Sequence, residues 1–70
     1  MFNQKTLAKL HFTLDNPAFY AVVIAPTRIV WKVSSKQEAL EATSALLASG
    51  VSASFYKEAT GPHWMLEVTA

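Results

Sequence analysis

Cysteine is absent from the 70-residue chain, which excludes disulfide bonds, thiol nucleophiles and thiolate metal sites. Glycine is scarce, with two residues, so a glycine-rich phosphate-binding loop is not expected. Neither sign of charge dominates, because six Lys and Arg against five Asp and Glu give a formal net charge of +1. A strongly basic nucleic-acid binder and an acidic mimic of DNA are therefore both disfavoured.

Long apolar runs are also missing. The longest strongly apolar stretch, Phe19 to Ala25, is much too short to cross a bilayer. The first residues lack the basic-then-apolar layout of a signal peptide. We therefore expect a cytoplasmic protein with no membrane partner.

The composition favours a folded protein, since 51% of the residues are hydrophobic and 16% are charged. We expect one domain, residues 1–70. A domain of this size buries only about 60% of the surface that its unfolded chain exposes. The core must be thin, and some apolar side chains should remain on the surface, where a partner or a second copy can cover them.

Alternation of apolar and polar residues predicts five strands, at 6–14, 19–25, 28–33, 51–56 and 63–68. Turn chemistry separates them at Asp15-Asn16-Pro17, at Pro26-Thr27 and at Gly61-Pro62. The first strand has an alternative interpretation. Residues 4–12 also fit a short helix, with Leu7, Leu10 and His11 on one side.

One helix is predicted at about 36–49. Ser35 and Glu38 form a capping box at its start, and Gly50 suits its C-terminal end. We expect Leu40, Leu46 and Leu47 to dock the helix on the sheet. The predicted fold class is α+β, with the order β-β-β-α-β-β and a mainly antiparallel five-stranded sheet that carries the helix on one face. The strand order stays open, because the last hairpin either pairs in parallel with the third strand or inserts elsewhere.

A single helix covers one face of the sheet, and the alternation decides which residues lie on each face. The predicted core face consists of Ala8, Leu10, Phe12, Leu14, Phe19, Ala21, Val23, Ile29, Trp31, Val33, Val51, Ala53, Phe55, Trp64, Leu66 and Val68. The opposite face combines an apolar centre with a polar and basic rim, which is typical of a protein contact surface. The residues predicted to bind a partner there are Tyr20, Val22, Ile24, Arg28, Val30, Lys32, Tyr56, His63 and Met65.

No residue pattern indicates catalysis. His11 and His63 lack the neighbouring ligands that a metal site needs, and Asp15 is explained as a turn residue before Asn16-Pro17. There is no GxSxG sequence and no carboxylate pair at fixed spacing. We expect a protein that is not an enzyme and has no catalytic residue, cofactor or metal.

Two other functions compete with protein binding. Tyr20, Tyr56 and His63 could stack on bases while Lys9, Arg28 and Lys32 contact phosphates, as in sheet-based RNA binders. The RNP-type consensus is missing, however, and aliphatic residues occupy places where stacking rings are needed. Nucleic acid is therefore the less favoured ligand. The second alternative is a homodimeric structural module that closes the same apolar face.

In size, composition and order of elements, the chain resembles the small single-domain inhibitors that phages and other mobile elements encode against bacterial defence, notably anti-CRISPR proteins. The resemblance is one of type and carries no diagnostic motif, so no functional residue is transferred. It implies a non-catalytic inhibitor in the host-cell cytoplasm that blocks a defence complex, such as a CRISPR effector, by direct contact. Tyr20, Arg28, Tyr56 and Met65 are then the expected anchors, because these residue types are enriched at interface cores.

Overall fold

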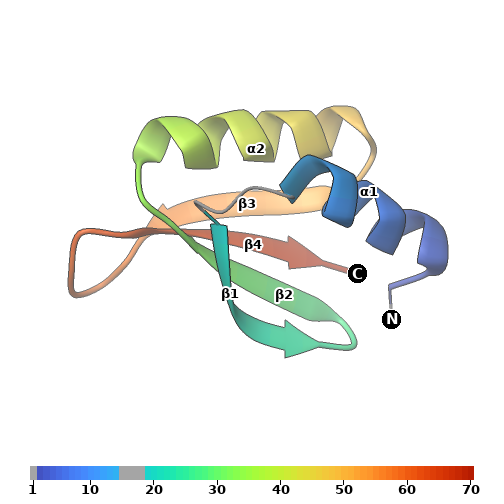
Figure 1. Ribbon diagram of the computed structural model, residues 1–70, viewed down its shortest axis with the longest axis horizontal. Helices are drawn as coiled ribbons and strands as arrows, with labels where there is room; N and C mark the ends of the chain where they lie inside the picture. Colours follow the sequence, from blue (N-terminus) through green and yellow to red (C-terminus); the bar gives the residue numbers. More distant parts are fainter. Residues whose placement is uncertain (1, 15–18) are drawn as a thin grey trace.

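The chain folds into two helices and one four-stranded sheet, which confirms the α+β class (Figure 1). The computed structural model describes residues 2–14 and 19–70, with only the backbone of 11–14. The elements are α1 (Gln4–Leu14), β1 (Phe19–Ala25), β2 (Arg28–Val33), α2 (Lys36–Ala48), β3 (Ser52–Lys57) and β4 (Trp64–Thr69). The prediction of five strands and one helix is therefore wrong in its first element.

The segment predicted as the first strand is helix α1, which is the alternative interpretation of residues 4–12. Asn3 explains why the helix forms. Its side-chain oxygen accepts from the backbone N–H of Thr6 at 2.8 Å, which is the bond of an N-cap residue. Leu10 then joins the core and Leu7 packs against it, whereas Ala8 is exposed. The predicted core side chains of Phe12 and Leu14, the side chain of His11 and the turn at Asp15-Asn16-Pro17 lie outside the described residues.

The sheet is antiparallel throughout, in the order β1-β2-β4-β3. The last strand therefore inserts between β2 and β3, which resolves the open strand order. Both neighbours run antiparallel to β4, so β2 and β3 run in the same direction and α2 connects them as a split β-α-β unit. The hairpin at Pro26-Thr27 forms as predicted, with Ala25 opposite Arg28.

Helix α2 has the predicted ends. The Ser35 hydroxyl accepts from the backbone N–H of Glu38 at 3.2 Å, while the Glu38 carboxylate accepts from Ser34 instead of the cap N–H. At the other end Gly50 has a φ of +80°, and Val51 donates to the Leu46 carbonyl at 2.9 Å. This is the Schellman pattern, in which glycine takes the left-handed position without the cost of a Cβ.

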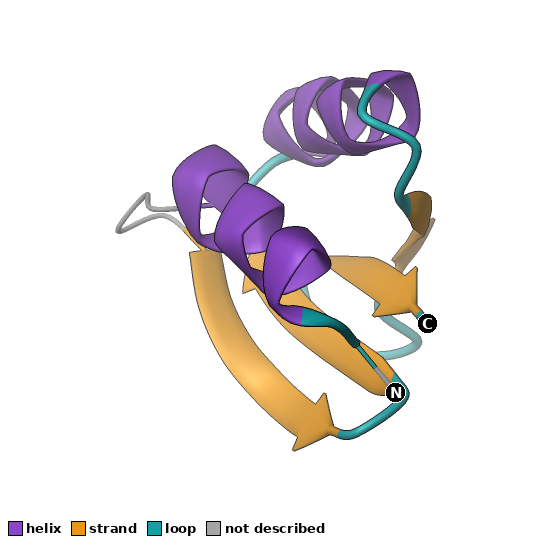
Figure 2. Ribbon diagram, turned by 90° about the vertical axis from the view of Figure 1, so that its right-hand side faces the viewer, coloured by secondary structure: helices purple, strands orange, loops and turns teal. Residues whose placement is uncertain are grey.

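Both helices lie on the same side of the sheet, α2 over β3 and β4 and α1 toward β1 (Figure 2). The buried residues of α2 are Ala39, Ala42, Thr43 and Leu46. Three of them are small, so the helix lies close to the strands. Leu66 and Val68 of β4 are fully buried beneath this layer. No helix in the described ranges is long and apolar enough to span a bilayer.

The predicted docking face of α2 is only partly right. Leu46 is completely buried, but Leu47 is 55% exposed and Leu40 is also exposed. Consecutive residues differ by about 100° around a helix, so Leu47 cannot share the direction of Leu46. Leu40 and Leu47 instead lie on a flank of the helix.

Leu46→Ala and Leu47→Ala form a matched pair for testing this arrangement. Truncating buried Leu46 should lower the free energy of unfolding by about 2 to 5 kcal/mol, because it leaves a cavity. Truncating Leu47 should change it by about 0.5 kcal/mol, as at other surface positions. Urea denaturation followed by circular dichroism measures both. Equal losses in the two variants would contradict the observed orientation of α2.

Candidate functional site

The face of the sheet away from the helices is the candidate site, and we call it the open face. It is formed by alternate residues of three regular strands and by part of β1. Cross-strand pairs share a face, so the register defines its members. They are Tyr20, Val23 and Ala25 of β1, Arg28, Val30 and Lys32 of β2, Ser52, Ser54 and Tyr56 of β3, and Met65, Glu67 and Thr69 of β4.

A bulge in β1 corrects two of the predicted face assignments. The register shifts between Ala21 and Val23, so Val22 is the additional residue. Beyond the bulge, Val23 pairs with Val30 and lies on the open face, although it was predicted in the core. Ile24 pairs with Ile29 and lies on the helix face, although it was predicted to bind a partner. Ile24 is nevertheless 78% exposed, because β1 is an edge strand.

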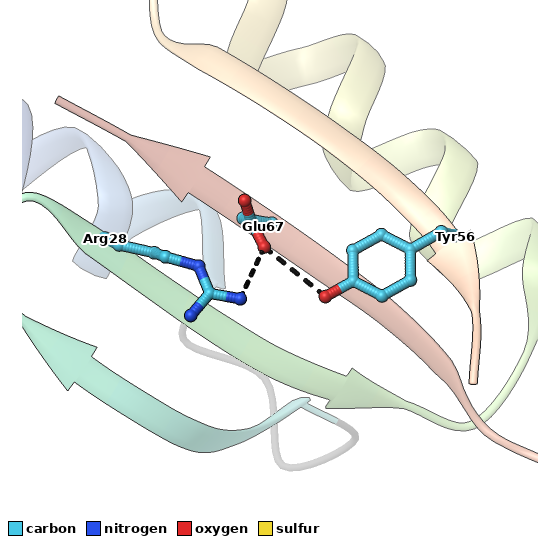
Figure 3. Close-up of polar contacts among 3 residues, drawn as sticks. All are labelled: Arg28, Tyr56 and Glu67. Carbon is cyan, nitrogen blue, oxygen red and sulfur yellow. Dashed lines mark hydrogen bonds and ion pairs between the residues drawn. The ribbon is translucent and has the colours of Figure 1, made fainter. Parts of the chain in front are cut away.

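Glu67 is the centre of a polar network on the open face (Figure 3). The guanidinium of Arg28 donates to Glu67 Oε1 at 2.9 Å, and the Tyr56 hydroxyl donates to the same oxygen at 3.3 Å. Glu67 pairs directly with Val30 and Ser54, so both donors are diagonal neighbours on adjacent strands. The hydrogen bond to Glu67 and its negative charge raise the pKa of Arg28, which therefore stays charged.

A second charged cluster lies where the open face meets the β3–β4 loop. Glu58 Oε1 is 3.5 Å from Lys32 Nζ, and Glu58 Oε2 is 3.5 Å from His63 Nδ1. The loop closes through a backbone bond from Glu58 to the His63 carbonyl. The loop thus brings His63 near Lys32, and the Glu58 carboxylate contacts both side chains.

Val30 lies beneath these polar groups and is only 1% exposed. It is on the open face, as predicted, but it is not available as a contact residue. Its neighbours along β2 are Arg28 and Lys32, and across the strands they are Val23 and Glu67. Long side chains cover apolar surface with their stems while their charged ends stay in water, so we attribute the burial of Val30 to its neighbours.

The remaining predicted contact residues are accessible to different extents. Tyr20 is 70% exposed, and Tyr56, Arg28 and Val22 are also exposed. Lys32, His63 and Met65 are half-buried. Sequence reasoning omitted Glu67 and Glu58 from the contact residues. Glu67 was recognisable from the alternation of its strand, whereas no local pattern marks Glu58, which lies in a loop.

The chemistry available at the open face is that of paired charges, hydroxyls and aromatic rings. Within residues 2–10 and 19–70, no three His, Asp or Glu side chains come together in a way that could hold a metal ion. The pair of Glu58 and His63 supplies two such groups, fewer than a protein metal site uses.

Comparisons with protein-family models, with curated proteins and with solved structures give no match.

Substituting lysine at Val30 and at Tyr20 tests the difference in burial on the open face. Val30→Lys should lower the free energy of unfolding by about 3 kcal/mol or more, because it forces a charge into a covered position. Tyr20→Lys should change it by about 0.5 kcal/mol. Thermal melting followed by circular dichroism separates the two. A Val30→Lys variant as stable as the parent would mean that the side chains around Val30 do not cover it.

Proposed function

We propose that the chain is a non-catalytic protein-binding module, an inhibitor of the anti-CRISPR type that blocks a host defence complex by direct contact through the open face. One observation carries this proposal. Exposed Tyr20 and Tyr56 lie on a face whose central aliphatic residue, Val30, is buried, and the cations Arg28 and Lys32 on this face are paired with carboxylates. A surface of this composition suits a protein partner better than a polyanion.

Tyr56 and Arg28 are suited to serve as binding anchors. The Tyr56 ring is held by the bond from its hydroxyl to Glu67, and Arg28 is held by the same carboxylate. Side chains that are already ordered lose less conformational entropy on binding. Tyr and Arg are also the residue types most often found as interface hot spots.

The pairing of the cations argues against the nucleic-acid alternative. Affinity for nucleic acid comes largely from phosphates that displace counterions by contacting Lys and Arg. On the open face, Glu67 and Glu58 already neutralise Arg28 and Lys32. A phosphate would have to compete with carboxylates of the same chain, so we place nucleic-acid binding second.

A phage-plating assay tests the proposed inhibition. Cells that carry different CRISPR effector types are challenged with a targeted phage, with and without expression of this protein. For at least one effector type, the protein should raise the efficiency of plating, and the Tyr20→Ala, Tyr56→Ala double variant should lose the effect. Each lost hot spot should weaken binding about 30-fold.

Lys5→Ala is the control for this assay, because Lys5 is exposed on α1, away from the open face. It should inhibit like the parent protein. Failure of the parent in every effector type would refute inhibition of the anti-CRISPR type. Full inhibition by the double variant would remove the open face as the contact surface.

Titration with single-stranded and duplex oligonucleotides separates the two candidate functions. We expect weak binding that falls steeply with salt, because few cations are available for phosphate contacts. Fluorescence anisotropy at moderate ionic strength measures it. Submicromolar binding that depends on Tyr20 and Tyr56 would favour the nucleic-acid function instead.

A further inference from the structure

Strand β3 is an edge of the sheet, and the exposed flank of α2 lies above that edge. Among the described strands β3 has one neighbour, β4. Its outer backbone N–H and C=O groups are thus available to another strand. On α2, Leu40 is 42% exposed and Leu47 is 55% exposed. Helix α1 contacts α2 from the β1 side (Figure 2). Because the connection from β2 through α2 to β3 is right-handed, the residue that follows each buried position, Leu40 after Ala39 and Leu47 after Leu46, points about 100° away from the core toward the β3 edge.

We propose that this edge pairs with the β3 edge of a second copy of the chain, forming a two-fold symmetric dimer with a continuous eight-stranded sheet. In such a dimer β3 lies antiparallel to the partner's β3. The two α2 helices then lie side by side and antiparallel, so Leu40 of one copy meets the partner's Leu47. A two-fold contact requires a self-complementary surface, and two leucines placed symmetrically about the middle of the helix provide one.

The spacing of the helix and the strand agrees with a single axis. The midpoint of Leu40 and Leu47 lies about 7 Å along the helix from Ala48, at about 1.5 Å per residue. The strand starts at Ser52 and runs back alongside the helix. At about 3.3 Å per residue, a distance of about 7 Å along the strand from Ser52 ends at Ser54. One axis near Ser54 therefore relates both the strands and the leucines, and it places Ser54 opposite the partner's Ser54.

The charges on this edge also fit a second copy. Ser52–Tyr56 carries no charged residue, and Thr43 and Ser44, which lie between Leu40 and Leu47 on the same flank, are uncharged, so no like charges meet near the axis. Glu41 is turned about 100° away from Leu40. Lys36 and Lys57 both lie within 6 Å of the Trp64 ring, at one end of the edge. In the dimer, the two-fold axis places the lysine pair of one copy and the lysine pair of the second copy at opposite ends of the interface. Each pair then lies toward the C-terminal end of the partner's α2, whose last turn has no basic residue and whose dipole attracts cations.

The other sheet edge is less suited to pairing. β1 also exposes apolar side chains, Tyr20 and Ile24. Its bulge at Val22 interrupts the regular register, and bulges are one of the features by which edge strands avoid pairing. β3 pairs with β4 without a register shift.

Sedimentation velocity over a range of protein concentrations tests the dimer. One strand pair and two leucines from each copy form an interface at the small end of the range, below about 1,200 Å². We therefore expect reversible association with a micromolar rather than nanomolar dissociation constant. Leu47→Glu should weaken it at least about tenfold, because it places a charge in the apolar contact. Ile24→Glu, on the β1 edge, should leave it unchanged.

Cysteine cross-linking provides a second test that does not depend on a disruptive substitution. The chain has no native cysteine, and Ser54 is exposed. Under mild oxidation Ser54→Cys should form a disulfide-linked dimer much faster than Ile24→Cys, because the axis brings its two thiols together. A parent protein that stays monomeric to about 1 mM would overturn the proposal. Dimerisation blocked by Ile24→Glu but not by Leu47→Glu would also overturn it, in favour of the β1 edge. Neither result bears on the open face.

Discussion

The last strand of the chain is the central strand of the sheet, and the rest of the structure depends on its pairing. β4 pairs with both β2 and β3, which α2 connects but which do not pair with each other. Toward the helices, Leu66 and Val68 fill the core. Toward the open face, Glu67 between them in sequence binds Arg28 and Tyr56. The core and the candidate site are thus two sides of one strand, and the network of Glu67 requires β4 to be paired with both β2 and β3.

The regular strands could be predicted from the sequence because their pairing preserves the alternation of faces. Residues 28–33 match β2, and the third and fourth observed strands lie within one residue of their predicted ranges. Arg28, Lys32 and Tyr56 were therefore placed on the correct face. In β1 the alternation of faces is broken at Val22. This additional residue moves each residue after it to the face opposite the one that simple alternation predicts. Nothing in a run of seven uncharged residues indicates where such a bulge occurs.

The helices were harder to predict, for different physical reasons. The alternation of Ala8 and Leu10 fits a strand, while the spacing of Leu7 and Leu10 fits a helix. The residue that favours the helix, Asn3, lies before both patterns. In α2, hydrophobicity alone favours leucine as the docking residue. The helix instead turns Ala39 and Ala42 toward the sheet, because small residues allow a closer approach of the two layers. Burial of Val30 depends on the length of its neighbours, which an alternation of apolar and polar residues does not describe.

The two proposed surfaces are compatible and would reinforce each other. An axis perpendicular to the sheet keeps both open faces on the same side of the dimer. With the axis near Ser54, Tyr56 lies opposite the partner's Ser52, so the two Tyr56 rings flank the junction while the two Tyr20 rings lie at the far edges. A target that contacts the junction would touch both copies. Once the target has bound one copy, its contact with the second copy would be intramolecular. This raises the overall affinity without any new kind of interaction. A weakly associated dimer would therefore bind such a target more tightly than a single copy, provided that the target contacts both copies at once.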